Sequence, residues 1–223
     1  MAMNVVDKID HLVSVRNVLM SVSDKSGLDT FVPALMAANP DLKIFSTGGT
    51  FSRLTEILEA SADAHLIQVS EYTGQPETQG GLVKTLDFKI YLGLLTETYN
   101  QAHQGDLSRT GSVPIDMVVV NLYPFRETIS KPDVTVEQAR GNIDIGGPCM
   151  IRASAKNFIR VASVVDPADY EIISGELKAN NGALPLNLRY RLAQKAFDHT
   201  AAYDRTIADF LSNKAFPDVE SCY

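Results

Sequence analysis

The sequence lacks most of the features that mark specialised classes of protein. It contains no tryptophan and only 2 cysteines. Cys149 and Cys222 lie far apart and show neither C-x-x-C nor zinc-site spacing, which argues against a disulfide scaffold and favours a reducing compartment. No run approaches the roughly eighteen apolar residues of a membrane-spanning helix, and residues 1–16 lack the apolar core of a signal peptide. We therefore expect a soluble, cytoplasmic protein without a membrane partner.

Basic residues are also scarce. The chain has 20 basic against 27 acidic residues, a net charge of −7 that disfavours non-specific binding to nucleic acid or anionic lipid. Its 4 histidines show no metal-site or catalytic-triad spacing. A complete P-loop, a dinucleotide-binding fingerprint and a G-x-S-x-G motif are missing from the sequence. An anionic ligand therefore needs a local cluster of cations on an acidic surface.

The chain does contain an alternation of short apolar runs and amphipathic stretches, which is typical of βαβ units and a parallel sheet. We expect strands at residues 18–22, 43–45, 65–69, 117–122 and 161–165. We expect helices at 28–38 and 51–60, one that begins after Asp166-Pro167, and a long amphipathic one at 186–213. Residues 71–81 are typical of a loop. With 223 residues, 45% of them hydrophobic, we predict one domain over residues 1–223, with 1–16 as an N-terminal extension.

The segment at residues 142–156 concentrates groups that suit chemistry. Asp144 precedes Gly146-Gly147-Pro148, and proline suits the first turn of a helix. The two glycines allow a ligand to approach the free amides of that helix N-terminus. Arg152 and Lys156 are four residues apart and share a helix face. A carboxylate, free amides and an ammonium together suit proton transfer around a small anion.

Two polar turns follow the first two predicted strands. They are Ser23-Asp24-Lys25 and Thr47-Gly48-Gly49-Thr50. Both are expected at the carboxyl edge of the sheet, where open α/β sheets bind ligands. Hydroxyls, glycine amides and Lys25 suit a phosphate group. Each turn alone is more typical of a helix cap that binds nothing, and their recurrence on neighbouring units modestly strengthens the case for a ligand.

Further candidates lie in two other segments. Lys84-Thr85 follow Gly80-Gly81 and suit a phosphate or a polarised carbonyl, but the segment taken alone is more typical of a surface lysine at the start of a strand. Asn121 and Tyr123 end the strongest predicted strand, and at period two they share one side of it. Tyr123 is otherwise a solvated aromatic at the rim.

The order of these motifs resembles the IMP cyclohydrolase domain, the N-terminal half of the bifunctional purine biosynthesis protein PurH. The resemblance extends over roughly residues 17–212 and rests on residues 22–28, 46–50, 83–86, 120–125, 142–147, 152–157 and 195–204. It implies an α/β fold like that of methylglyoxal synthase, with three layers, a mostly parallel sheet and a helical C-terminal segment. It also implies that 5-formamidoimidazole-4-carboxamide ribotide (FAICAR) is closed to IMP with loss of water, without a cofactor or a metal ion.

The resemblance implies catalytic roles for Lys84, Tyr123, Asp144 and Lys156. Asp144, assisted by Lys156, would manage protons at the carboxamide, which requires the two side chains to meet over the substrate. Helix amides, with Lys84 or Tyr123, would stabilise the oxyanion. The implied substrate contacts are Ser23, Asp24, Lys25, Thr47, Gly48, Gly49, Thr50, Thr85, Asn121, Ile145, Gly146, Gly147 and Arg152.

The segment around Lys84 departs from the family's usual Gly-Arg-Val-Lys-Thr-Leu-His-Pro and from a later His-Gly pair. Leu82 takes the place of the arginine and removes a cation from the phosphate side. Asp87 takes the place of a histidine and is unfavourable near a phosphate unless Lys89 or another cation neutralises it. The four implied catalytic residues are present, so we expect an active enzyme. The remaining departures are Phe88, Tyr91 and Leu92.

Two other functions are compatible with the same motifs. One is a nucleotide-binding protein that has lost catalysis and acts as the partner of a separate AICAR formyltransferase. The other is a lyase of the methylglyoxal synthase type that acts on a triose phosphate. The segments at 142–147 and 152–157 favour the cyclohydrolase. The family also implies a homodimer, for which the amphipathic helix at 186–213 offers a face.

Overall fold

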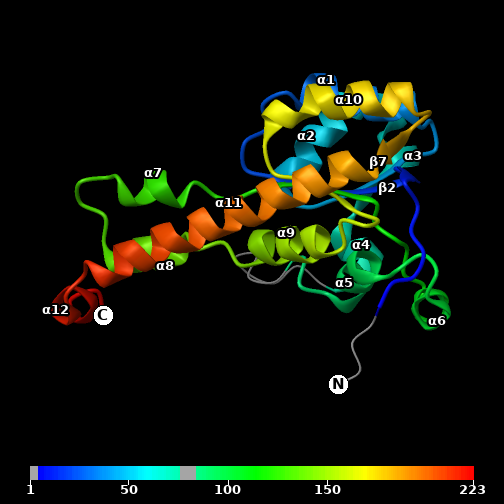
Figure 1. Ribbon diagram of the computed structural model, residues 1–223. Helices are drawn as coiled ribbons and strands as arrows, with labels where there is room; N and C mark the ends of the chain where they lie inside the picture. Colours follow the sequence, from blue (N-terminus) through cyan, green and yellow to red (C-terminus); the bar gives the residue numbers. More distant parts are fainter. Residues whose placement is uncertain (1–4, 76–83) are drawn as a thin grey trace.

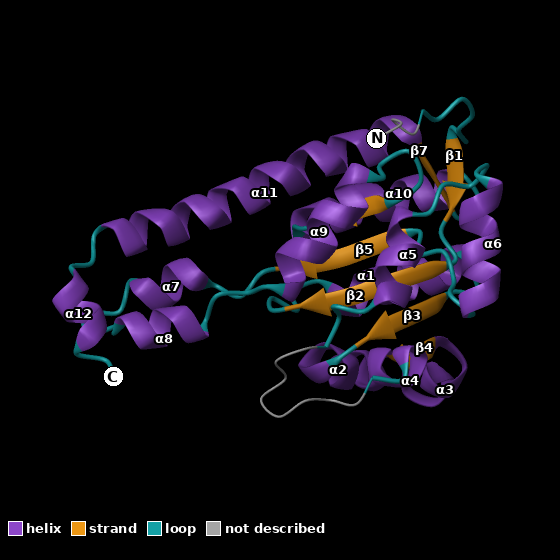
Figure 2. Ribbon diagram, turned by 90° about the horizontal axis from the view of Figure 1, so that it is seen from below, coloured by secondary structure: helices purple, strands orange, loops and turns teal. Residues whose placement is uncertain are grey.

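The computed structural model describes residues 5–75 and 84–223 (Figure 1). Its centre is a five-stranded parallel sheet with the strand order β4-β3-β2-β5-β6. The strands are β2 (Asn17–Val22), β3 (Lys43–Ser46), β4 (Leu66–Gln68), β5 (Met117–Asn121) and β6 (Ala162–Val164). All four neighbouring pairs are parallel. In Figure 2 the arrowheads of β2, β3 and β5 point toward the same end of the molecule, so their carboxyl ends form one edge.

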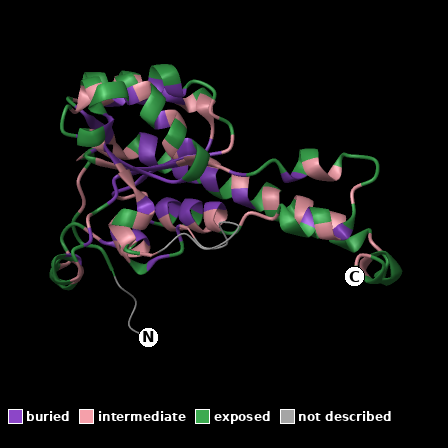
Figure 3. Ribbon diagram, turned by 180° about the vertical axis from the view of Figure 1, so that it is seen from behind, coloured by how far each residue is buried: buried purple, intermediate pink, exposed green. Residues whose placement is uncertain are grey.

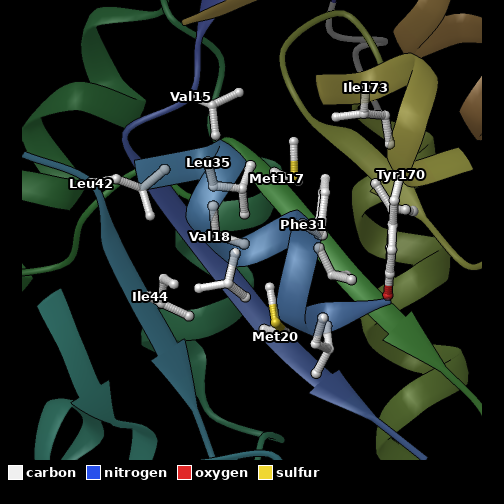
Figure 4. Packing of buried hydrophobic residues seen from close by; sticks show 14 of the residues in the cluster. Val15, Val18, Met20, Phe31, Leu35, Leu42, Ile44, Met117, Tyr170 and Ile173 are labelled. Carbon is white, nitrogen blue, oxygen red and sulfur yellow. The ribbon is translucent and has the colours of Figure 1, made fainter. Parts of the chain in front are cut away.

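Both faces of this sheet are covered by helices, which gives three layers. On one face lie α1 (Leu28–Ala38), α2 (Gly48–Leu58) and α10 (Tyr170–Ala179). Val18 and Met20 of β2 pack on this side with Phe31 of α1, and Phe31 stacks on Tyr170 with ring centroids 4.1 Å apart (Figure 4). Burial of such apolar side chains is the main stabilising contribution to the fold.

On the opposite face lie α5 (Phe88–Leu95) and α9 (Gly146–Lys156). Leu19 of β2 and Val118 of β5 belong to this second buried cluster, whereas their neighbours along each strand belong to the first. Side chains of a strand alternate between its faces, so a strand buried on both faces must be apolar throughout. This is why the continuous apolar runs predict β2 and β5 correctly.

The long helix α11 (Leu186–Ser212) packs along edge strand β6 and against α9. Leu188 and Leu192 join the first buried cluster, and Ala193 and Ala196 join the second. The helix therefore closes one side of the core and covers an edge that would otherwise be open to other strands. A separate antiparallel pair, β1 (Leu12–Ser14) and β7 (Ala183–Pro185), attaches the N-terminal segment to the body.

The remaining elements are short. Around the sheet lie η1 (Glu59–Ser61), α3 (Ala62–His65), α4 (Val69–Thr73), α6 (Gln101–Thr110) and η3 (Pro167–Asp169). A second group comprises α7 (Phe125–Ile129), α8 (Val136–Gly141) and α12 (Phe216–Glu220). Together with the end of α11, this second group projects from the body as an arm, and most of the arm is exposed or half-buried (Figure 3).

The predicted fold class and the major elements are confirmed, and three local predictions are wrong. The second helix begins at Gly48 rather than at residue 51. Residues 69–73, partly predicted as loop, form α4. Lys84 does not begin a strand, because it lies in an irregular segment that leads into α5. Within the described residues, the helices are too short or too polar to cross a lipid bilayer.

Candidate active site

The carboxyl ends of β2, β3 and β5 bring together segments that are far apart in the sequence. Val22 of β2 pairs with Asn121 of β5, and Met20 pairs with Ser46 at the end of β3. The turns that follow these strands therefore share one edge of the sheet. Helices α2 and α9 also begin there, so their free N-terminal amides lie at the same edge.

Asn121 fixes the turn after β2. Its Oδ1 accepts hydrogen bonds from the amides of Ser23 at 2.7 Å and Asp24 at 2.8 Å, and its Nδ2 donates to the Asp24 carbonyl at 2.9 Å. The Asp24 carboxylate accepts from the Ser26 amide at 2.9 Å, and the bonds from Ser26 lower the pKa of Asp24. These side chains hold the turn that carries Lys25, rather than extending toward a ligand.

Two lysines lie over the first turn of α2. A Cβ atom added to Gly48 would lie 3.6 Å from Lys84 Nζ, and one added to Gly49 would lie 3.9 Å from Lys25 Nζ. Gly48 has a φ of 56°, which glycine adopts without strain. Two ammonium groups beside the amides of a helix N-terminus form a strong site for an anion such as phosphate.

The two threonines at this turn have different surroundings. Thr50 Oγ1 accepts from the Val22 amide and donates to the Val22 carbonyl, both at 3.0 Å. Its hydroxyl is therefore committed to holding α2 against β2. Thr47 precedes α2 but its side chain does not cap the helix.

Asp144 sits at the N-terminus of α9 in a half-buried position. Its Oδ1 accepts from the Gly147 amide at 2.9 Å, and the carboxylate also accepts from the Tyr123 amide. A Cβ atom added to Gly147 would lie 2.6 Å from both Asp144 Oδ2 and Leu122 Cδ2, so only glycine fits there. Burial raises the pKa of Asp144, while the two amide bonds oppose that shift. The carboxylate is therefore a stronger proton acceptor than an exposed aspartate.

Lys84 and Thr85 join the two helix N-termini. Lys84 Nζ lies near Gly48 of α2, and Thr85 Oγ1 lies 2.8 Å from where a Cβ atom of Gly146 in α9 would be. Lys84 and Thr85 are consecutive residues, so their Cα atoms are only about 3.8 Å apart. Because one contacts the start of α2 and the other the start of α9, these two helix N-termini flank one site. Tyr123 and Ile145 border this site, each 59% exposed.

Two of the predicted site residues lie elsewhere. Lys156 is the last residue of α9, whose 11 residues span about 15 Å. It is exposed, and the next residue, Asn157, donates to the carbonyls of Leu94 and Thr96 near the opposite edge of the sheet. The expectation that Asp144 and Lys156 meet over the substrate within one chain is therefore wrong.

Arg152 is also directed away from the site. It is exposed on α9, and its guanidinium carbon lies 5.6 Å from the centroid of the Phe197 ring on α11. A cation over an aromatic ring is a favourable packing arrangement on a helix surface. The motif at residues 142–156 predicted helix α9 correctly. It did not distinguish side chains at the N-terminus of α9, which lie at the candidate site, from side chains farther along the helix.

The departures around Lys84 are explained in part by the structure. Asp87 is buried and caps α5, since it accepts from the Lys89 amide at 2.8 Å and from Gln75 Nε2 at 2.7 Å. Its charge is thus stabilised by the helix N-terminus, whereas Lys89 Nζ donates to the Tyr72 carbonyl at 3.1 Å. The other positions differ in burial. Phe88 is exposed and Leu92 is half-buried. The Tyr91 hydroxyl is buried with no hydrogen-bond partner among the described residues, and Leu82 lies outside those residues.

Helix α11 contributes side chains that were not predicted as part of the site. The Asp144 amide donates to the Tyr203 hydroxyl at 2.8 Å. One and two turns earlier along the helix lie His199 and Lys195, and Lys195 Nζ pairs with Asp166 at 2.7 Å and Asp169 at 2.8 Å. Their four-residue spacing on a single helix face was visible in the sequence. The contacts that these side chains make were not visible, because their partners Asp144, Asp166 and Asp169 are distant along the chain.

Comparison with known proteins divides the chain into two matched regions. The family model described as "MGS-like domain" matches residues 28–149, and the one described as "AICARFT/IMPCHase bienzyme" matches residues 154–222. The bifunctional purine biosynthesis protein PurH of Lactiplantibacillus plantarum is 50% identical over 203 residues, which are 91% of this chain and 38% of that protein. PurH of Bacillus cereus strain Q1 is 47% identical over 199 residues, 89% of this chain and 37% of that protein.

A solved structure has the same overall arrangement. The crystal structure of ForH superimposes with a TM-score of 0.73 at 29% sequence identity, and the match covers 89% of this chain and 100% of that one. The curated relatives are much longer than this chain, which spans well under half of their length. The similarity therefore concerns the part of those proteins that corresponds to this domain.

Proposed function

This chain belongs to the MGS-like domain family, and we propose that it is an IMP cyclohydrolase that closes the six-membered ring of IMP from FAICAR. The similarity to PurH supports a role in purine biosynthesis. The observation that carries the specific proposal is the paired site at the carboxyl edge. The N-terminus of α2, with Lys25 beside it, suits the ribotide phosphate, and the N-terminus of α9, with a half-buried carboxylate, suits the reacting amides.

The proposed binding mode follows from the charges. The phosphate lies at the N-terminus of α2 beside Lys25, where amides and an ammonium replace its hydration shell. The imidazole ring then extends past Lys84-Thr85 toward the N-terminus of α9. Tyr123 and Ile145, both exposed, cover the base. The residues on this edge hold the substrate by its two polar ends.

The proposed reaction moves two protons and releases one water molecule. The carboxamide nitrogen attacks the formyl carbon, and Asp144 accepts a proton from that nitrogen. The formyl oxygen becomes an oxyanion, which the amides at the start of α9 stabilise. One such donor is typically worth about 3–4 kcal/mol of the barrier. The oxygen is then protonated twice and leaves as water, while the formamide nitrogen loses its proton and the ring C=N bond forms.

Lys84 is assigned the proton donation to the leaving oxygen, with the Tyr123 hydroxyl as its neighbour at the rim. Its ammonium is already directed to this edge, and it has no hydrogen-bond or ion-pair partner within residues 5–75 and 84–223. In this scheme Asp144 acts without Lys156, since α9 separates the two side chains. No step requires a cofactor or a metal ion.

The activity is tested by incubating the purified protein with FAICAR and following IMP formation by ultraviolet absorbance. Steady turnover to IMP supports the proposal. Binding of FAICAR without product would instead indicate a non-catalytic partner of a separate AICAR formyltransferase. Conversion of dihydroxyacetone phosphate alone would indicate the lyase. In the proposed role, a separate formyltransferase supplies FAICAR in the cytoplasm.

The proposed assembly is a homodimer in which the arm takes part. The arm carries exposed apolar side chains, with Leu211 47%, Phe216 73% and Tyr223 79% exposed. Large exposed apolar groups of this kind commonly mark an interface. Sedimentation equilibrium tests this proposal: a dimer mass for the intact chain that falls to a monomer mass in Phe216→Glu supports it, whereas a monomer at all concentrations contradicts it.

A further inference from the structure

Helix α11 passes directly beside the loop that carries Asp144. This loop, residues 142–145, lies between the end of α8 and the start of α9 and has no regular secondary structure of its own. Tyr203 of α11 is half-buried, and its hydroxyl accepts from the Asp144 amide at 2.8 Å. The same hydroxyl donates to the Asn142 carbonyl at 3.5 Å, a long and weak contact. One side chain thus contacts the loop at two peptide groups.

The Tyr203 ring is itself held in place by aromatic packing at the base of the arm. It packs edge-on against Phe125, with ring centroids 6.1 Å apart, and Phe125 is 2% exposed. Phe125 begins α7 and also packs edge-on against Phe210 of α11, with ring centroids 6.0 Å apart. The hydroxyl position is therefore set by apolar packing and not by the loop that it contacts.

We propose that Tyr203 is a positioning residue for Asp144, which fixes the loop backbone so that the carboxylate is directed at the reacting amide of the substrate. This inference rests on the proposed function, because the positioning has a catalytic meaning only if Asp144 accepts a proton. Three hydrogen bonds then fix the position of Asp144. Its amide donates to the Tyr203 hydroxyl, and its carboxylate accepts from the amides of Gly147 and Tyr123. They come from α11, α9 and the segment after β5.

The surroundings of Asp144 make the effect of Tyr203 measurable. The groups that act on its carboxylate are the Gly147 and Tyr123 amides, and burial opposes its ionisation. The ionisable groups on the α11 side are the Tyr203 phenol and Asp204. Burial raises the pKa of Tyr203, and the charges of Asp144 and Asp204 add to that shift. Without the hydroxyl, the Asp144 amide needs water as its acceptor. Water in the loop then hydrates the carboxylate and lowers its pKa toward the ordinary value.

The test compares Tyr203→Phe with Tyr190→Phe. Both substitutions remove one hydroxyl from α11, but Tyr190 is 49% exposed and packs on Phe158, remote from Asp144. For each variant, kcat and KM for FAICAR are measured, and the Asp144 carboxyl is titrated by NMR in the ligand-free protein. We expect Tyr203→Phe to lower kcat about tenfold, to leave KM within about twofold, and to lower the pKa of Asp144. Tyr190→Phe should match the wild type in all three.

The outcomes separate this inference from the proposed function. If the wild type makes no IMP but the pKa of Asp144 falls in Tyr203→Phe alone, the cyclohydrolase proposal fails and the positioning of Asp144 stands. If the wild type makes IMP and Tyr203→Phe leaves both kcat and the pKa of Asp144 unchanged, the positioning role is overturned. Equal changes in both tyrosine variants would also overturn it, because they would indicate a general effect on α11.

Discussion

The two edges of the five-stranded sheet use positive charge in opposite ways. At the amino edge, Arg160 is 5% exposed and Arg189 is 0% exposed. Their guanidinium groups donate hydrogen bonds to backbone carbonyls of the protein. Arg160 pairs with Asp116 at 3.1 Å and donates to the Thr96 carbonyl at 2.9 Å. At the carboxyl edge, Lys25 makes one long hydrogen bond, 3.4 Å, to the Ser23 carbonyl among the described residues, and its charge helps to lower the pKa of Asp24. Lys84 has no hydrogen-bond or ion-pair partner among the same residues.

This difference is the one expected between charges that hold the fold together and charges that bind a ligand. A buried cation is tolerated only when its donors are satisfied, so arginine, with five fixed donors, suits the amino edge. A cation that binds an anionic ligand must keep its donors available, which leaves it weakly bonded in the free protein. The same contrast applies to the carboxylates, since Asp116 is paired, whereas Asp144 is held by amides and has no cationic partner among the described side chains.

The largest predicted effect is on turnover at the carboxyl edge. Asp144→Asn keeps an oxygen that can accept from Gly147 but removes the proton acceptor. We expect kcat for IMP formation to fall about a thousandfold, the typical scale of general-base catalysis, with little change in FAICAR binding. Asp133→Asn, an exposed position in the arm, is the control and should behave as wild type. Turnover within tenfold of wild type in Asp144→Asn would remove Asp144 from the mechanism.

The next effect is on stability at the amino edge. Arg189 donates to the carbonyls of five residues, Asp10, His11, Phe158, Ile159 and Leu184, and burial lowers its pKa to about 10. Arg189→Met leaves these carbonyls without donors, and we expect the free energy of unfolding in urea to fall by about 3 kcal/mol. The exposed Arg191→Met on the same helix should change it by less than about 0.5 kcal/mol. Equal stability of the two variants would contradict the assignment.

A smaller effect is predicted for substrate binding. Lys25→Met removes one ammonium from the N-terminus of α2, and a charge-assisted hydrogen bond contributes about 2 kcal/mol. We therefore expect the Kd for IMP, measured by calorimetry, to rise about thirtyfold, while the unfolding midpoint stays unchanged. Lys178→Met, on the exposed side of α10, is the matched control. A destabilised Lys25→Met with unchanged affinity would show that Lys25 belongs with the structural charges.

A pH dependence of stability is predicted at the carboxyl edge. Burial raises the pKa of Asp144, so the folded state holds this proton more tightly than the unfolded state does. Its contribution to stability is therefore present at low pH and is lost as the pH rises through the raised pKa. Urea unfolding of wild type and Asp144→Asn should show the Asn variant gaining stability relative to wild type over that interval. A wild type that instead gains relative stability with rising pH would contradict the sign.

The smallest effect is predicted for Lys156. Because α9 separates it from Asp144 by about 15 Å, we expect Lys156→Ala to keep kcat within about threefold of wild type. Assays at increasing protein concentration sharpen this prediction. A loss of several orders of magnitude would show that Lys156 reaches a catalytic site, which in this fold requires a neighbouring copy to supply it.

Much of the fold was predictable because its signals are local. The runs at β2 and β5, the helix at 28–38 and the long helix at 186–213 follow from apolar patterning alone. The start of α2 was missed because two glycines look like a turn. The pairing of β1 with β7 was missed because each strand has 3 residues. Such short strands carry no clear periodicity.

The site was predictable only in part, for the same reason. Strand-end turns and glycine pairs are local patterns, and they predicted Lys25, Lys84 and Asp144, which the structure places at one edge of the sheet. The contact between Tyr203 and Asp144 joins residues 59 positions apart, and no local pattern announces it. The separation of Asp144 from Lys156, by contrast, follows from the rise of a single helix and was available from the sequence.

The most direct test of the contrast between the two edges is a crystal structure of this protein with IMP bound. We predict the phosphate at the N-terminus of α2 beside Lys25, and the purine base past Lys84 at the N-terminus of α9, within hydrogen-bond distance of Asp144. A phosphate bound elsewhere, or a base remote from Asp144 while Lys25 and Lys84 stay in solvent, would contradict it.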